Sequence, residues 1–182
     1  MTPAEWSLSG TDGELYVNTG VTGRAAKMGH RLTIAMKDWR ASVRWTDAEP
    51  VAVKLTVDVG SLEVLSGEGG VTPLSAPEKA MARSNALKSL EAQRFPEIRC
   101  EADDIAKTGD GYRLTGTLTI RGQRREHVVD LHVDDLGDSW RMSCETEVHQ
   151  TDFGVKPYSM LMGAMKVADP VTVSFTAQRP KD

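Results

Sequence analysis

The chain has 182 residues, of which 40% are hydrophobic and 26% are charged, and its formal net charge is −4. A chain of this length suits one domain, because folding at this size hides roughly 70% of the unfolded chain's surface. The negative charge argues against a general electrostatic attraction to nucleic acid or to an anionic membrane. We therefore expect one globular domain over residues 1–182, with no nucleic acid as a partner.

The N-terminal sequence MTPAEWSLSGTDGE has neither a basic segment nor an apolar run, so no signal peptide is predicted. No stretch reaches the ~20 apolar residues of a transmembrane helix. Cys100 and Cys144 are too far apart in sequence for a Cys-x-x-Cys pattern. These features predict a cytoplasmic protein with two reduced cysteines and no stable membrane insertion.

Alternation of apolar and polar residues with a period of two dominates the chain and predicts antiparallel strands with one buried face. In residues 32–45 the alternation changes parity near Lys37–Asp38, which predicts a β-bulge. The segment 53–62 places Leu55 and Val57 on one face. Further strands are expected at 14–21, 96–105, 112–120, 128–133, 139–148 and 171–177.

One segment breaks this pattern. Ser75 and Glu78 stand at capping-box spacing, and Pro77 falls in the first turn. We predict one amphipathic helix over about 76–91, with Ala80, Ser84, Leu87 and Leu90 as its apolar stripe, lying over the sheet or across one end. Residues 65–73 before it are expected to form a glycine-rich loop.

A single sheet with one apolar face tends to curl and close, because closure removes its exposed edges. The predicted fold is therefore all-β: a closed antiparallel up-and-down barrel of about eight strands, with one flanking α-helix.

The histidines and cysteines do not suggest a catalytic or metal-binding set. His127 and His132 are an odd number of residues apart on one strand, so they should face opposite sides and cannot chelate one metal. His30 is expected to hydrogen-bond to backbone, with a role at a ligand's head group as the alternative. Cys144 is expected to be an inert core thiol. With no nucleophile elbow, zinc-protease motif or phosphate-binding glycine loop, we expect neither an enzyme nor a metal site.

Arg121, Arg124 and Arg125 gather at a hairpin tip. Such a cluster could meet phosphates or lipid head groups. The simpler interpretation, and the one we favour, is a charged turn that keeps the hairpin soluble.

Five blocks in order resemble the YceI family of bacterial lipocalin-like proteins: AKMGHRLTI, VKLTVDVGSL, SNALKSLEAQRFPEIRCEADDI, YRLTGTLTIRGQRREHVVDLHV and HQTDFGVKPYSMLMGAMKVADPVTVSF. The resemblance runs from about residue 13 to 178. It implies an eight-stranded lipocalin-like barrel with a helix, enclosing an elongated apolar pore. In relatives this pore holds a polyisoprenoid chain, such as an isoprenoid quinone. The resemblance supplies no catalytic set, and Arg31 departs from the small or acidic residue that commonly follows the family's histidine.

The sequence leaves open whether the barrel is hollow or filled, since a barrel of this size can hold either its own side chains or one slim ligand. Inward Ala41, Ala102, Gly116 and Ala177 favour a cavity. Together with the resemblance, they predict a carrier, buffer or sensor of an isoprenoid or isoprenoid-quinone type lipid, bound without covalent attachment and with no other cofactor. The predicted ligand-binding residues are Ile34, Met36, Leu55, Val57, Leu118, Met142, Phe153, Leu161, Met162 and Phe175.

The segment 158–167 is rich in methionine and precedes the last strand. Its flexible, polarizable side chains could close over a ligand at the mouth of the barrel. They could instead plug the barrel end, or form an exposed patch that pairs two copies of the chain. The alternative function is therefore a structural or interaction protein with a filled barrel, which uses 158–167 as a partner or homodimer surface.

Overall fold

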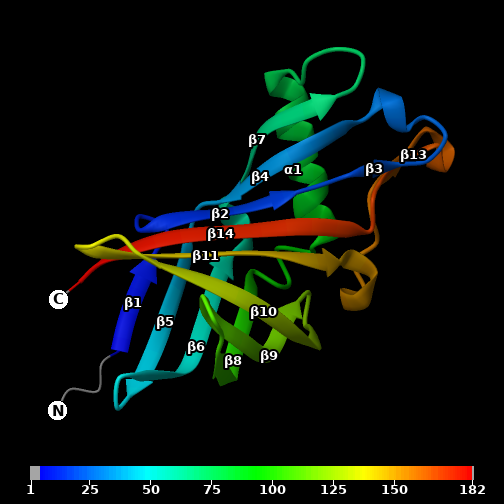
Figure 1. Cartoon of the computed structure of the whole chain (residues 1–182). Coiled ribbons are helices and arrows are strands. Elements are labelled where there is room, and N and C mark those ends of the chain that lie inside the picture. Colours follow the sequence, from blue (N-terminus) through cyan, green and yellow to red (C-terminus); the bar gives the residue numbers. More distant parts are fainter. Residues whose placement is uncertain (1–4, 182) are drawn as a thin grey trace.

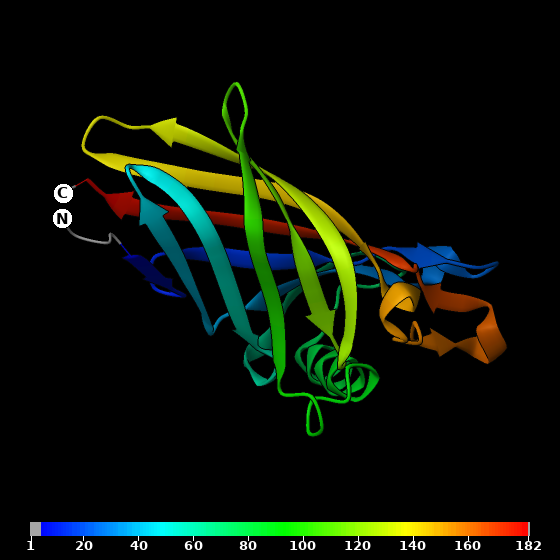
Figure 2. The same ribbon diagram turned by 90° about the horizontal axis from the view of Figure 1, so that it is seen from below.

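The computed structural model describes residues 5–181 and shows an all-β fold with one α-helix (Figure 1). The main sheet has eleven antiparallel strands in the order β1-β5-β6-β8-β9-β10-β11-β14-β2-β4-β7. The prediction of antiparallel strands with one helix is confirmed, and the sheet curls strongly (Figure 2). Its strands are β1 (Glu5–Ser9), β2 (Gly13–Asn18), β4 (His30–Met36), β5 (Trp39–Thr46), β6 (Glu49–Asp58), β7 (Leu62–Gly69), β8 (Glu97–Lys107), β9 (Gly111–Ile120), β10 (Gln123–Asp135), β11 (Ser139–His149) and β14 (Pro170–Pro180). The outermost parts of the expected domain, residues 1–4 and 182, lie outside the described residues.

The bulge predicted near Lys37–Asp38 is wrong: the structure has a break between two strands there. β4 pairs with β2 and β7, whereas β5 pairs with β1 and β6. The amide of Asp38 donates to Ser61 Oγ at 2.9 Å, which ties this corner to the 3-10 turn η2 (Val59–Ser61) between β6 and β7. Because long strands are divided at such corners, the main sheet has eleven strands where about eight were expected.

Helix α1 (Ala76–Ser89) begins where the capping box predicted. Ser75 Oγ accepts a hydrogen bond from the Glu78 amide at 3.3 Å, and the Glu78 carboxylate accepts one from the Ser75 amide at 3.2 Å. These two bonds satisfy amides that the first helical turn leaves without intrahelical partners. The prediction of one helix, about 76–91, is confirmed to within two residues.

The helix lies across one end of the curled sheet (Figure 2). Arg83 fixes it there: its Nε donates to the Leu62 carbonyl and its Nη2 to the Gly60 carbonyl, both at 2.7 Å. Strand β7 occupies part of the segment 65–73, which had been expected to be a loop. The glycines in that segment obscured the strand, because glycine is rare in strand interiors.

A second, three-stranded sheet extends beyond the main one near the start of β4 (Figure 1). It contains β3 (Val21–Thr22), β12 (Ser159–Met160) and β13 (Met165–Val167), in the order β12-β13-β3. Two short 3-10 turns adjoin it, η1 (Ala26–Met28) and η4 (Leu161–Gly163), and a third, η3 (Gln150–Phe153), packs against β10. The connection before the last strand is therefore structured and pairs with the N-terminal part of the chain.

The opposite end of the molecule, near both termini, is packed with aromatic rings. The ring centroids of Trp6 and Trp45 lie 4.7 Å apart, and the Arg179 guanidinium stacks over Trp6 at 4.9 Å. Lys181 Nζ lies 4.3 Å from the ring centroid of Trp140. We call these five residues the tryptophan end. Contacts of this kind between cations and aromatic faces stabilise a fold by electrostatic attraction to the ring.

Candidate ligand-binding cavity

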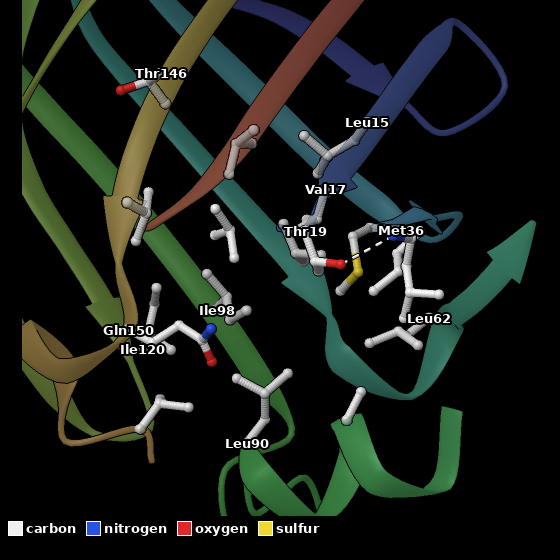
Figure 3. Close-up of a pocket in the computed structure, with 18 of the residues that line it drawn as sticks. Leu15, Val17, Thr19, Met36, Leu62, Leu90, Ile98, Ile120, Thr146 and Gln150 are labelled. Carbon is white, nitrogen blue, oxygen red and sulfur yellow. Dashed lines mark hydrogen bonds between the residues drawn. The ribbon is translucent and has the colours of Figure 1, made fainter. Parts of the chain in front are cut away.

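A cavity of about 620 Å³ lies inside the curve of the main sheet. Its wall combines inward side chains of the strands with one side of α1 and parts of the segment 150–167. Figure 3 shows Val17, Leu62, Leu90, Ile98 and Ile120 around one shared space, although they come from separate parts of the chain. The period-two alternation explains this wall, because each strand turns one apolar face inward.

Most of the residues predicted to bind a ligand are part of this wall. The wall residues among them are Ile34, Met36, Leu55, Val57, Leu118, Met142, Phe153 and Phe175. Leu161 and Met162 are not among the wall residues: Leu161 is 52% exposed and Met162 is fully exposed. Both have positive φ, 53° and 54°, in turn η4, where the alternation rule for strands does not apply.

Sequence reasoning missed the contribution of the helix to the wall. Met81, Ala82, Asn85 and Ala86 face the cavity. The expected stripe is confirmed at Leu87 and Leu90, which pack against the core, and is wrong at Ala80 and Ser84, which are exposed. The recurrence of residues at 78, 81, 82, 85, 86 and 89 has helical spacing and could have identified the correct face.

Methionines surround the opening of the cavity. Met28, Met81 and Met160 line the cavity while remaining 55%, 61% and 43% exposed, so the wall reaches solvent at this point. Met165 and Tyr158 complete the set, which we call the methionine mouth. The segment 158–167 was expected to form the mouth of the barrel, a plug or an exposed patch. Met160 and Met165 lie at the mouth, whereas Leu161 and Met162 are not part of the wall.

Several polar groups on the wall are uncharged and are hydrogen-bonded within the protein. His127 Nε2 and Thr146 Oγ1 are hydrogen-bonded at 2.9 Å, and burial lowers the pKa of His127. Gln150 Nε2 donates to the Ala168 carbonyl at 3.0 Å. Thr19 Oγ1 accepts from the Leu32 amide at 3.0 Å (Figure 3). Each of these polar groups therefore already has a protein partner inside an apolar surface.

The His127–Thr146 bond also spans a seam in the sheet. β10 and β11 pair only over His132–Asp135 and Trp140–Ser143. Beyond this short ladder β10 continues with β9 alone and β11 with β14 alone. A side-chain bond thus links the two strands where backbone pairing has ended.

His132 lies on the outer face, as predicted from its odd spacing from His127. Its ring contacts Asp134 at 2.7 Å and Asp110 at 3.1 Å, and hydrogen bonds to these carboxylates raise the pKa of His132. No cluster of three metal-ligating side chains occurs within residues 5–181. His30 Nε2 bonds to the Thr72 carbonyl at 2.8 Å, which confirms the expected backbone bond, and its ring also lies on the cavity wall.

Both cysteines are free thiols on the cavity wall. Burial raises the pKa of Cys144 to about 11, with a further contribution from Cys100. Burial likewise raises the pKa of Cys100. Since the thiolate is the reactive form, both groups are poor nucleophiles near neutral pH.

The arginines at the β9–β10 hairpin tie neighbouring elements together. Arg121 pairs with Glu91 and donates to the Gly154 carbonyl at 3.0 Å. Arg125 donates to the Asp152 carbonyl at 2.8 Å. These bonds hold the hairpin against the helix end and η3, so two of the three arginines have a structural role.

A curled antiparallel sheet around an apolar cavity defines an all-β protein of the kind that can enclose a small apolar molecule. The chain belongs to the YceI-like domain family, whose model matches residues 5–179. This confirms the resemblance seen in the sequence.

Solved structures support the fold. The crystal structure of BcnA from Burkholderia cenocepacia is similar with a TM-score of 0.68 and 19% identity, over 92% of this chain and 96% of that chain. The YceI protein of Campylobacter jejuni is similar with a TM-score of 0.60 and 16% identity, over 82% of this chain and 84% of that chain. No curated protein matches the sequence significantly. Among residues 5–181, no helix is both long and apolar enough to cross a bilayer.

Proposed function

We propose that the protein binds one long apolar ligand, of the isoprenoid or isoprenoid-quinone type, and serves as its carrier, buffer or sensor. The observation that carries this proposal is the cavity of about 620 Å³ with an almost wholly apolar wall. Sites for small molecules have volumes of about 300–1,000 Å³. Removing a hydrocarbon chain from water would supply roughly 25 cal/mol per Å² of buried apolar area. Membership of the YceI-like family supports the same ligand class.

The proposal includes a closed barrel of eight strands, for which the strand order is the support. The edge strand β1 runs on into β2, and the other edge strand β7 continues from β6. When β1/β2, β4/β5 and β6/β7 are each taken as one bent strand, they form with β8, β9, β10, β11 and β14 a ring of eight in which every strand has two neighbours. The one long gap in this ring is the seam between β10 and β11, which pair only over His132–Asp135 and Trp140–Ser143.

Binding without catalysis is part of the proposal. The thiols of Cys100 and Cys144 are held protonated by burial, and His127 is held neutral and bonded to Thr146. A catalytic nucleophile needs an activating base or a lowered pKa, and neither cysteine has a lowered pKa. The cytoplasmic location expected from the sequence stays a prediction.

The first test is organic extraction of denatured protein, purified from a bacterial host, followed by mass spectrometry. We expect a stoichiometric species with a prenyl chain. An empty extract, repeated with protein from a host that makes the relevant lipids, would contradict the proposal.

The second test fills the cavity. Leu118 is 8% exposed and Val57 is 3% exposed, and both face the cavity. Leu118→Trp or Val57→Trp should abolish lipid uptake because the larger ring occupies the ligand's space, while circular dichroism shows a folded sheet. Val128→Trp is the matched control, since Val128 is 45% exposed and is not part of the wall. Unchanged uptake in both cavity variants would refute the binding site.

A second candidate is an interaction protein that uses the segment 158–167 to bind a partner or to form a homodimer. The exposed side chains of Leu161 and Met162 favour it. Self-association that Met160→Ser with Met162→Ser abolishes, in protein without extractable lipid, would support this candidate.

A further inference from the structure

Three exposed apolar side chains belong to the segments that carry the methionine mouth. Leu161 is 52% exposed, Met162 is fully exposed, and Met28 is 55% exposed. They belong to segments 20–31 and 154–168, which meet in the small sheet β12-β13-β3 and project at one end of the molecule (Figure 1). We call these two segments the tip. Clustered apolar exposure of this kind is a feature of interaction surfaces.

The tip is also basic, although the whole chain is acidic. No acidic residue occurs between Glu14 and Asp38 or between Asp152 and Asp169, in a chain with a net charge of −4. Arg24, Lys27, Lys156 and Lys166 are all exposed, and none of them forms an ion pair within residues 5–181. Four cations without carboxylate partners therefore belong to the same two segments as the exposed apolar groups.

Acids on adjoining elements are already engaged. Asp169, which follows the tip, accepts hydrogen bonds from the Thr151 amide and hydroxyl, both at 2.8 Å. Glu68 on β7 lies 3.8 Å from Arg31. The carboxylate of Glu78 is held in the capping box of α1, where hydrogen bonds from Ser75 lower its pKa. Charge effects between exposed groups fade beyond about 10 Å at moderate salt, so the local charge of the tip outweighs the net charge of the chain at a surface.

The backbone of turn η4, within the tip, also indicates an interaction surface. Leu161 and Met162 both have positive φ, which side-chain-bearing residues rarely adopt. Such a conformation costs on the order of 1 kcal/mol per residue, yet here it leaves the side chain of Met162 fully exposed and that of Leu161 half exposed to solvent. A partner that covers them would offset this cost.

We propose that the tip docks onto the surface of an anionic lipid bilayer. Leu161 and Met162 enter the boundary between head groups and acyl chains, and Arg24, Lys27, Lys156 and Lys166 meet the lipid phosphates. Apolar side chains flanked by cations are the composition of interfacial membrane-binding segments. Because Met28 and Met160 belong to both the tip and the mouth, docking turns the opening of the cavity towards the bilayer. This inference goes beyond ligand binding, since docking does not require an occupied cavity.

The test is co-sedimentation of the full chain with vesicles of phosphatidylcholine alone or mixed with phosphatidylglycerol. We expect binding only to vesicles that contain phosphatidylglycerol, and weaker binding at high salt. Lys27→Gln with Lys166→Gln should lower the affinity about 30-fold, from the contribution of two basic residues near an anionic surface. Leu161→Ser with Met162→Ser should weaken binding at every salt concentration.

The matched controls are Leu136→Ser and Lys107→Gln. Leu136 is 41% exposed in the β10–β11 hairpin, and Lys107 is exposed at the end of β8. Both controls should bind vesicles like the unaltered protein, and thermal unfolding should show that every variant is folded. Absent binding to phosphatidylglycerol vesicles, or equal losses in tip and control variants, would overturn the proposal. Concentration-dependent self-association that the Leu161 and Met162 changes abolish would also overturn it, in favour of a second copy as the occupant.

This experiment is separable from the tests of the cavity. Protein stripped of lipid, or carrying Leu118→Trp, should still bind the vesicles. If the protein binds vesicles but its extract is empty, lipid binding in the cavity is refuted and docking stands. If the extract contains lipid but the protein does not bind vesicles, docking is refuted and lipid binding stands.

Discussion

The two ends of the molecule use different apolar side chains for different purposes. None of the four tryptophans lies on the cavity wall, whereas Met28, Met36, Met81, Met142, Met160 and Met165 all do. Tryptophan is large and has few rotatable bonds, so it fills space with a fixed shape. Methionine is unbranched and adapts to irregular neighbours. The contrast shows how one alternating pattern can place rigid rings at one end of the molecule and a hollow with flexible side chains at the other.

The largest expected effect is a loss of stability, which should be large for a tightly packed side chain and small for one that lines the mouth of the cavity. Trp39 is 1% exposed and its ring meets Phe175 edge-on at 5.1 Å. Trp39→Ala should lower the free energy of unfolding by about 3–5 kcal/mol, because it leaves a void in close-packed surroundings. Met81→Ala at the mouth, where Met81 is 61% exposed, should cost less than about 0.5 kcal/mol. Urea unfolding measures both, and similar losses would remove the distinction.

An intermediate effect concerns the tryptophan end itself. Arg179→Ala removes the stacking over Trp6 at 4.9 Å and should cost about 1 kcal/mol. The amount of bound lipid should not change, since Arg179 is not part of the cavity wall. Lys107→Ala serves as the control for removing a basic residue. Loss of lipid in the Arg179 variant would show that the two ends are not independent.

The smallest expected effect is the pH dependence of stability, which should have opposite sign inside and outside the cavity. Burial lowers the pKa of His127. The contribution of His127 to the free energy of unfolding is therefore complete above the ordinary pKa of about 6.5 and is lost as pH falls below it. Hydrogen bonds to Asp134 and Asp110 raise the pKa of His132. The contribution of His132 to the free energy of unfolding is therefore complete below about pH 6.5 and is lost as pH rises.

Denaturant unfolding between pH 5 and 8, a range that brackets the ordinary histidine pKa, tests both signs. His127→Gln should remove a decline of stability towards acid pH. His132→Gln should remove a decline towards alkaline pH. Changes of the same sign in both variants would contradict the placement of the two rings on opposite faces.

Much of the fold was predictable because strand alternation and helix capping are local signals. Leu55, Val57 and Leu118 face inward as their parity requires, and Ser75 begins the helix as its spacing with Glu78 requires. The break after Met36 was not predictable, because a bulge and a change of pairing partners produce the same parity shift. The pairing partners β1 of β5 and β7 of β4 show that it is a change of partners and not a bulge.

The cavity was less predictable than the strands. Whether inward side chains fill a barrel depends on their summed volumes over many strands, and parity carries no information about volume. Leu161 and Met162 were assigned to the pore from composition alone, yet a turn with positive φ turns them outward. The helix face was predicted only at Leu87 and Leu90, because the small residues Ala82 and Ala86 that also face inward give a weak apolar signal.

The pairing of β14 with β2 has a consequence for how the protein is made. This ladder joins Asn18 to Thr172, positions 172 − 18 = 154 apart in the chain. On the ribosome, β2 soon has its neighbour β4, but its other neighbour β14 is made only about 150 residues later. Until then the nascent sheet has an unpaired edge, and such edges recruit other chains. Synthesis of β14 is thus the step that pairs this edge of β2 and lowers the risk of aggregation.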